Sequence, residues 1–301
     1  MTSVQKKVSS LYQFLLSDRT KEVFERFTLK IAILSFIVHL VLIYVNQFTP
    51  LFNIQSELLG NPIGAIYTPF SFILLYEVYL LIFYLPRSIT TYISKQYEII
   101  SLIIIRRLFK DLSNLKLSSD WFSLKEDLQF TYDIIASLLL FYLLYWFYRL
   151  NTNRKKMSAQ NPTLAVNVEK FISLKKIIAI GLVPILLVLA IYSLGSWSYE
   201  TLFVGNKKID SIKNINNVFF DEFFTVLIIV DVILLLVSFF YTDKFHKVIR
   251  NSGFVISTIL IRLSFSVDGI VNTVLIVAAV VFGLLILAIH NTYEKHLPIK
   301  E

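Results

Sequence analysis

The sequence predicts an all-α, polytopic membrane protein with about eight transmembrane helices, arranged as two tandem repeats of four. Three observations lead to this prediction. The chain of 301 residues is 56% hydrophobic and only 17% charged, whereas soluble globular chains average about 45–50% and 25%. Its apolar residues are concentrated in runs of about 20, the length that crosses roughly 30 Å of hydrocarbon. Two stretches of the first half also match stretches of the second.

The composition excludes several classes of protein. The chain has no cysteine, which rules out a disulfide scaffold and a Cys-ligated zinc or iron–sulfur centre. It carries no glycine-rich phosphate loop, HExxH motif or nucleophile elbow, so we predict no enzyme activity, cofactor or metal site. The net charge of +8 is accounted for by Lys and Arg in cytoplasmic loops, without nucleic acid as a partner.

Residues 1–28 are predicted to form an amphipathic cytoplasmic segment. Apolar residues recur at helical spacing through positions 4–15, with Lys6 and Lys7 on the other side. Ser17 or Asp18 could cap a second short helix. We expect this segment to lie on the inner surface of the membrane, with its basic face toward anionic lipid.

The predicted spans are of two kinds. Six runs are long and apolar: 29–48, 63–86, 130–148, 177–197, 223–241 and 270–289. Two further runs are shorter and carry arginine: 99–109 and 254–267. With polar flanks included, 88–112 and 247–267 are each long enough to cross, provided that neighbouring helices shield the flanks.

An internal repeat relates the two halves of the chain. Residues 70–81 align with 224–235 at an offset of 154, and residues 101–109 align with 257–265 at an offset of 156. Apolar runs align by chance, so the polar matches carry the weight. An acid and then an arginine occupy the same relative places in each half, which favours a true duplication, a common way to build transporter folds.

The repeat bears on topology, because the two shorter runs either cross the membrane or do not. With six spans, in two three-helix repeats, 18 of the 29 Lys and Arg residues lie inside; with eight spans, 20 lie inside. The positive-inside rule therefore favours eight spans, with both termini cytoplasmic. The predicted organisation is an amphipathic segment, a first repeat, a basic cytoplasmic linker, a second repeat and a cytoplasmic tail: 1–28, 29–150, 151–174, 175–292 and 293–301.

Charged residues inside apolar runs are the candidate functional sites. Each costs on the order of 3 kcal/mol at the centre of a span, so it should face the protein interior and be paired. We expect Glu77 to pair with Arg106 or Arg107, and Asp231 to pair with Arg262. These pairs would belong to an ion or proton pathway, or would simply lock two helices in register.

Two further residues are weaker candidates. His39 lies in the middle of the first span, where a hydrogen-bonded core histidine is the simplest interpretation. Glu98 has no acidic counterpart in the second half, since Phe254 aligns with it. It would extend a polar track or lie at the inner interface.

Two functions are compatible with these features. The first is an ion channel or secondary transporter, for a cation or proton, with the acids at the repeat interface. The second is a non-transporting sensor, scaffold or assembly subunit in which the ion pairs are structural. Ile, Phe, Tyr, Asn and Lys have AT-rich codons, and their frequency suggests a bacterial gene and thus a bacterial inner membrane. The chain is compatible with a homo-oligomer or with a membrane partner.

Overall fold

The computed structural model describes residues 3–48, 62–112, 125–158, 165–203, 210–241, 245–267 and 269–296. Every regular element within these ranges is helical, which confirms the all-α prediction. The elements are α1 (Ser3–Leu15), α2 (Asp18–Phe48), the short 3₁₀ helix η1 (Pro62–Ile66), α4 (Tyr67–Tyr84), α5 (Ile89–Leu112), α6 (Lys125–Ser158), α7 (Ala165–Phe203), α8 (Asp210–Phe239), α9 (Phe245–Ser264) and α10 (Ile270–His296).

The N-terminal segment is a short helix followed directly by the first long one. The second short helix expected within 1–28 is instead the beginning of α2, which continues without a break. Ser17 caps it, because its hydroxyl accepts a hydrogen bond from the Thr20 N–H at 3.1 Å. Helix α1 packs against α7, and the Tyr79 hydroxyl donates to the Leu15 carbonyl at 2.8 Å. The segment is therefore attached to the bundle as well as amphipathic.

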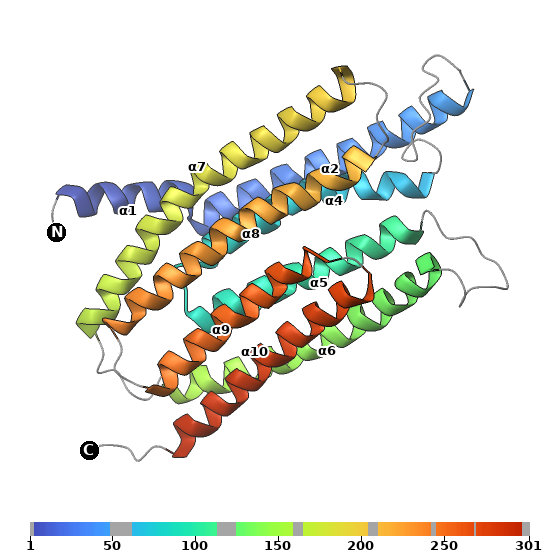
Figure 1. Cartoon of the computed structure of the whole chain (residues 1–301). Coiled ribbons are helices and arrows are strands. Elements are labelled where there is room, and N and C mark those ends of the chain that lie inside the picture. The colour runs from blue at the N-terminus through green and yellow to red at the C-terminus, as the bar shows by residue number, and fades with distance from the viewer. Residues whose placement is uncertain are drawn as a thin grey trace.

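The eight long helices of the described chain pack in the same order in each half. Helix α2 contacts α4, α4 contacts α5 and α5 contacts α6; α7, α8, α9 and α10 make the same series of contacts. In Figure 1 each long helix runs antiparallel to the one before it, so that α2 and α7, α4 and α8, α5 and α9, and α6 and α10 run in the same direction. The two halves meet where α6 packs on α10 and where α4 packs on α7.

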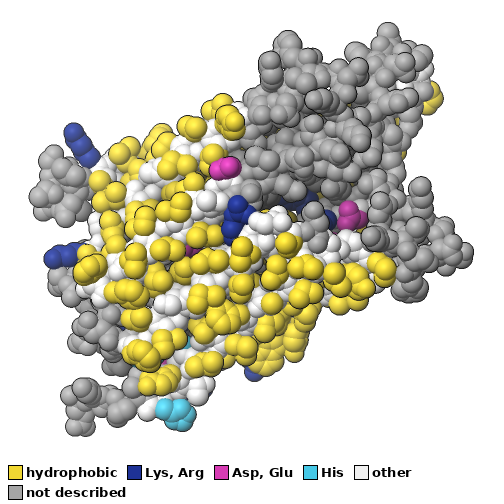
Figure 2. Space-filling model, viewed as in Figure 1, with side chains coloured by type: hydrophobic (Ala, Val, Ile, Leu, Met, Phe, Trp, Pro, Cys, Tyr) yellow, Lys and Arg dark blue, Asp and Glu magenta, His cyan; other side chains and the backbone are white. Residues whose placement is uncertain are grey.

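The outside of the bundle is apolar. Five helical stretches of the described chain are long and apolar enough to cross a membrane: Lys7–Asn46, Leu128–Thr152, Lys170–Tyr192, Glu222–Phe239 and Ile270–His296. Their outward side chains are large hydrophobic residues such as Leu138, Val188 and Ile289, each more than 60% exposed. Figure 2 shows hydrophobic side chains spread across the described part of one face. Apolar surface of this extent belongs in lipid, so the chain is an integral membrane protein with several spans.

Helix α5 lies in the interior of the bundle instead. Tyr92, Gln96, Tyr97, Ile100 and Ile104 are all at most 2% exposed. Helix α9 likewise buries polar side chains along its length. Because neighbouring helices cover these polar groups, α5 and α9 do not need the lipid-compatible composition of the outer helices.

Helices α6, α7 and α10 extend beyond the predicted ends of the two repeats. The linker predicted at 151–174 is largely helical: α6 runs to Ser158 and α7 begins at Ala165, with residues 159–164 outside the described ranges. At the other end, α10 runs to His296, into the tail predicted at 293–301. These helices extend past their apolar runs, because polar residues that water solvates can continue a helix.

Candidate functional site in the bundle interior

Glu77 and Arg106 form a buried ion pair between α4 and α5. The Arg106 Nη2 atom donates to Glu77 Oε2 at 2.6 Å, and the two residues are only 4–5% exposed. The contact lies within the first half, between helices that are neighbours along the chain. The structure thus brings together the acid and one of the two arginines that the sequence offered as its partner.

Arg107 takes a different partner, Asp133 on α6. Its Nη2 atom donates to Asp133 Oδ1 at 2.6 Å, and its Nε atom donates to Oδ2. Asp133 is fully buried and accepts two more hydrogen bonds, from Gln129 Nε2 at 2.9 Å and from the Thr273 hydroxyl at 2.8 Å. This bidentate geometry is the strongest that a guanidinium and a carboxylate can adopt.

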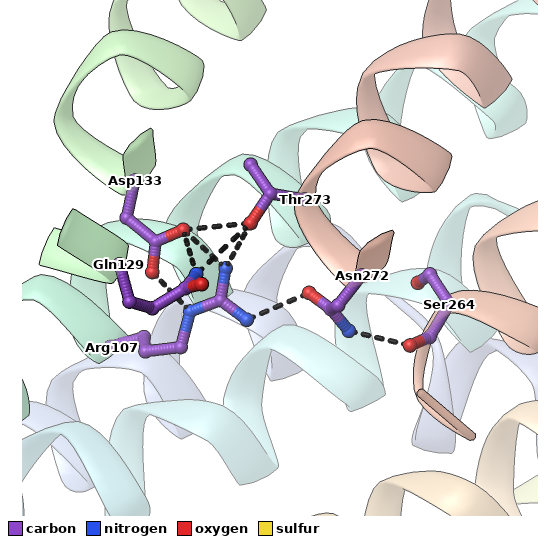
Figure 3. Close-up of polar contacts among 6 residues, drawn as sticks. All are labelled: Arg107, Gln129, Asp133, Ser264, Asn272 and Thr273. Atoms are coloured by element: carbon purple, nitrogen blue, oxygen red, sulfur yellow. Dashed lines mark hydrogen bonds and ion pairs between the residues drawn. The ribbon is translucent and has the colours of Figure 1, made fainter. Parts of the chain in front are cut away.

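The same cluster reaches into the second half (Figure 3). Arg107 Nη1 donates to Asn272 Oδ1 at 2.7 Å, and the Asn272 amide in turn donates to the Ser264 carbonyl at the end of α9. Together with Thr273, these contacts join α5 and α6 to α9 and α10. The cluster therefore fastens the two halves to each other at one end of the bundle.

Most members of this cluster are absent from the sequence-based candidates, although a signal for them existed. Asp133 lies three positions inside the predicted span 130–148, and Asn272 and Thr273 lie two and three positions inside the span 270–289. Each apolar run thus has polar residues just inside one end. Only the packing of α6 against α10 shows that these polar residues meet.

Asp231 lies on α8 and turns toward α5 of the first half. It is 6% exposed, and its Oδ2 atom accepts a hydrogen bond from Gln96 Nε2 at 3.2 Å. The side-chain oxygen Oε1 of Gln96 accepts a hydrogen bond from the Thr258 hydroxyl of α9 at 2.9 Å. The Tyr92 side chain, also buried, lies beside the carboxylate. The immediate hydrogen-bonding partner of Asp231 is therefore a neutral amide.

The contacts of Asp231 and Arg262 in the structure do not join them to each other. Arg262 Nε donates to the Thr225 hydroxyl at 3.0 Å, and Nη1 lies 3.4 Å from the Ser266 hydroxyl. Thr225 precedes Asp231 by six residues, which is about 9 Å along a helix axis. The register of α9 against α8 thus places the arginine more than one turn away from the acid. Positions that align between the two halves of the sequence thus do not make equivalent contacts here.

Lys175 is a buried cation at the edge of the predicted linker, and it is not among the sequence-based candidates. It is only 5% exposed, and its Nζ atom donates to the Arg87 carbonyl in the α4–α5 turn at 3.2 Å. It also interacts electrostatically with Asp231. The adjacent Lys176 points elsewhere, over the ring of Tyr12, because successive helical residues are rotated by about 100°.

The two weaker candidates have local partners. His39 Nδ1 is hydrogen bonded to the Thr68 hydroxyl, which joins α2 to α4. Glu98 forms an ion pair with Lys95 of its own helix, at 2.7 Å from Nζ to Oε2. Both are partly exposed, and these contacts lie apart from the hydrogen bonds that surround Asp231.

The described residues contain no group of three or more His, Asp or Glu side chains placed to hold a metal ion. Comparison of the chain with protein-family models, with curated proteins and with solved structures finds no match. Function therefore has to be inferred from the buried charges themselves.

Proposed function

We propose that this membrane protein is a channel or secondary transporter for a cation or proton, and that Asp231 is its ion-binding carboxylate. One observation carries the proposal: Asp231 is buried in the bundle and its direct partner is the neutral amide of Gln96. A carboxylate held away from water is costly unless it is neutralised. A site that keeps one beside an amide is suited to binding and releasing a positive charge.

We further propose that the chain crosses the membrane eight times, as two tandem four-helix repeats with both termini cytoplasmic. The shared contact order and direction of the two sets of helices support this arrangement. So does the contact of Asn291 Nδ2 with the Leu150 carbonyl at 3.0 Å, because Asn151-Thr152 and Asn291-Thr292 end the last spans of the two halves. The positive-inside rule supports the orientation, and a bacterial inner membrane remains the proposed location.

The orientation predicts which positions a reagent can reach. The chain has no native cysteine, so single cysteines can be introduced without background. We expect Ser158→Cys, at the end of α6, to resist a membrane-impermeant thiol reagent added to intact cells. Ser118→Cys, between α5 and α6, should label readily under the same conditions. Rapid labelling at position 158 would contradict the eight-span topology and favour six spans.

Transport is tested with purified protein in liposomes. We expect the wild type to dissipate an imposed cation or proton gradient and Asp231→Asn to reduce that flux to the level of empty liposomes, because an amide cannot take up a positive charge. The matched control is Glu98→Gln, which also neutralises an acid, but one that is partly exposed and paired with Lys95 of its own helix. Wild-type flux in a folded Asp231→Asn variant would contradict the proposal.

A second function, that of a non-transporting sensor or assembly subunit, is favoured by a different observation. The Gln96 side chain uses both its amide nitrogen and its carbonyl oxygen to join α5, α8 and α9, as a purely structural contact would. Exposed Leu11 and Phe14 on α1 fit an anchor in the inner leaflet, where anionic lipid would attract nearby lysines. Absence of flux in every gradient would favour this function.

A further inference from the structure

Two buried groups of opposite charge lie near each other on adjacent helices without being in direct contact. Lys175 of α7 and Asp231 of α8 interact electrostatically, and both are about 5% exposed. Among the ion pairs formed by the described residues, none joins them. The Lys175 ammonium donates a hydrogen bond to the Arg87 carbonyl, and the Asp231 carboxylate accepts one from the Gln96 amide.

This arrangement is informative because a buried ammonium and a buried carboxylate attract strongly in a low dielectric. With both groups charged, direct contact would offset part of the cost of burying them. Elsewhere in this bundle, Glu77 with Arg106 and Asp133 with Arg107 do form direct contacts. The separation of Lys175 from Asp231 is the arrangement expected when the carboxyl group carries a proton.

We propose that Lys175 is the internal counter-ion of Asp231. In this proposal the Lys175 ammonium and a proton alternate in neutralising the Asp231 carboxylate. In the first state of this exchange Asp231 carries the proton and Lys175 donates to the Arg87 carbonyl, as it does in the structure. When the proton leaves the Asp231 oxygen for water, the ammonium moves from the carbonyl to the carboxylate. Lys175 stays charged throughout, so the only covalent bond that changes is the O–H bond of the carboxyl group.

The inference deepens the proposed function, on which it rests, by naming the proton as the transported ion. The Gln96 amide presents an N–H donor to the carboxylate, and the Lys175 ammonium adds a positive charge near it. Donors repel a metal cation, which needs several oxygen ligands. A proton needs a single carboxylate oxygen, and it can be replaced by the ammonium without any other change of charge.

The exchange would also link the site to the contact between halves. The Lys175–Arg87 hydrogen bond joins α7 to the α4–α5 turn of the first half, in the region where α4 packs on α7. Movement of the ammonium to Asp231 would break this bond and form a contact within the second half. Loss of the proton would thus loosen one connection between the halves and favour a conformation in which they are less tightly joined.

The charged and titratable neighbours of the site are few. Tyr92 from α5 lies beside Asp231, and Lys175 comes from α7. Arg250 from α9 is within electrostatic range of Lys175 and its Nη1 atom contacts His290 Nε2 at 3.0 Å. Arg250 therefore adds a second positive charge near the ammonium of Lys175.

The test is an infrared pH titration of the protein in lipid, which follows the carbonyl stretch of protonated carboxyl groups. We expect a band in the wild type that disappears as the pH rises and that is missing from Asp231→Asn. Asp133→Asn is the matched control, since Asp133 is equally buried but is held in a bidentate pair with Arg107. Its band pattern should equal that of the wild type. A titrating band that survives in Asp231→Asn would overturn the inference.

Lys175 variants separate a counter-ion from a structural contact. In Lys175→Gln the band should persist to higher pH, by about one to three pH units, because no cation is left to replace the proton. Lys175→Arg, which keeps the charge, should restore a titration close to that of the wild type. An unchanged titration in Lys175→Gln would overturn the exchange, and this variant does not depend on Asp231→Asn being stable.

Flux measured in the same liposomes distinguishes the two proposals. Proton flux that is lost in Asp231→Asn and altered in Lys175→Gln supports both. Flux of Na⁺ or K⁺ that does not depend on pH would overturn the proton inference and leave the proposed transport function standing. If no gradient of a cation or proton produces flux, the transport function itself is overturned.

Discussion

Gly283→Ala is expected to destabilise the bundle by about 1–3 kcal/mol, the usual cost of overpacking a well-filled core. A Cβ atom at this position of α10 would lie 1.7 Å from the Tyr97 hydroxyl and 2.8 Å from the ring carbon that carries it. Tyr97 cannot move aside easily, because it is fully buried on α5 and its hydroxyl is hydrogen bonded to the Ser257 side chain at 2.7 Å. Thermal unfolding in detergent measures the effect.

Two further variants make this result specific. Tyr97→Phe removes the hydroxyl that clashes, so Gly283→Ala should cost less in the Tyr97→Phe background than in the wild type. Gly181→Ala on α7 is the matched control: a Cβ atom there meets nothing within 4 Å, and alanine favours a helix over glycine by up to about 1 kcal/mol. Equal losses at positions 283 and 181 would contradict the close contact of α5 with α10.

Breaking the Glu77–Arg106 pair is expected to destabilise the bundle strongly, because both partners are buried. Glu77→Gln leaves the Arg106 guanidinium buried without its carboxylate, and such a change typically costs about 3–5 kcal/mol. Glu77→Gln combined with Arg106→Gln should lose clearly less, because no lone charge is left behind. The measurement is again thermal unfolding, with the coupling taken from the four members of the cycle.

Asp231 and Arg262 provide the matched comparison, since they align with Glu77 and Arg106 in the sequence but make other contacts in the structure. Asp231→Asn and Arg262→Gln should therefore be additive to within about 0.5 kcal/mol. Strong coupling between these two residues would show that they pair in the membrane after all. A lack of coupling between Glu77 and Arg106 would contradict a stabilising ion pair in the first half.

The candidate site was only partly predictable. The expense of a charge in an apolar run is enough to single out Glu77, Arg106, Arg107 and Asp231 from the sequence alone. This cost does not distinguish Arg106 from Arg107 as the partner of Glu77. Adjacent helical residues point about 100° apart, and the packing of neighbouring helices decides which of the two faces α4. Nor does this cost place Lys175, because a lysine at the end of an apolar run can bury its charge or extend it into water.

The sequence by itself determined that the chain is a helical membrane protein and where most of its outer helices lie. A side chain that faces lipid has to be apolar, so α2, α6, α7, α8 and α10 are recognisable from composition alone. Only the tertiary structure decided the rest. Helices α5 and α9 face other helices, and their polar residues find partners there, so no rule of hydropathy constrains them. The partner of each buried charge depends on helix register. Arg262 contacts Thr225, which lies six residues before Asp231 on α8.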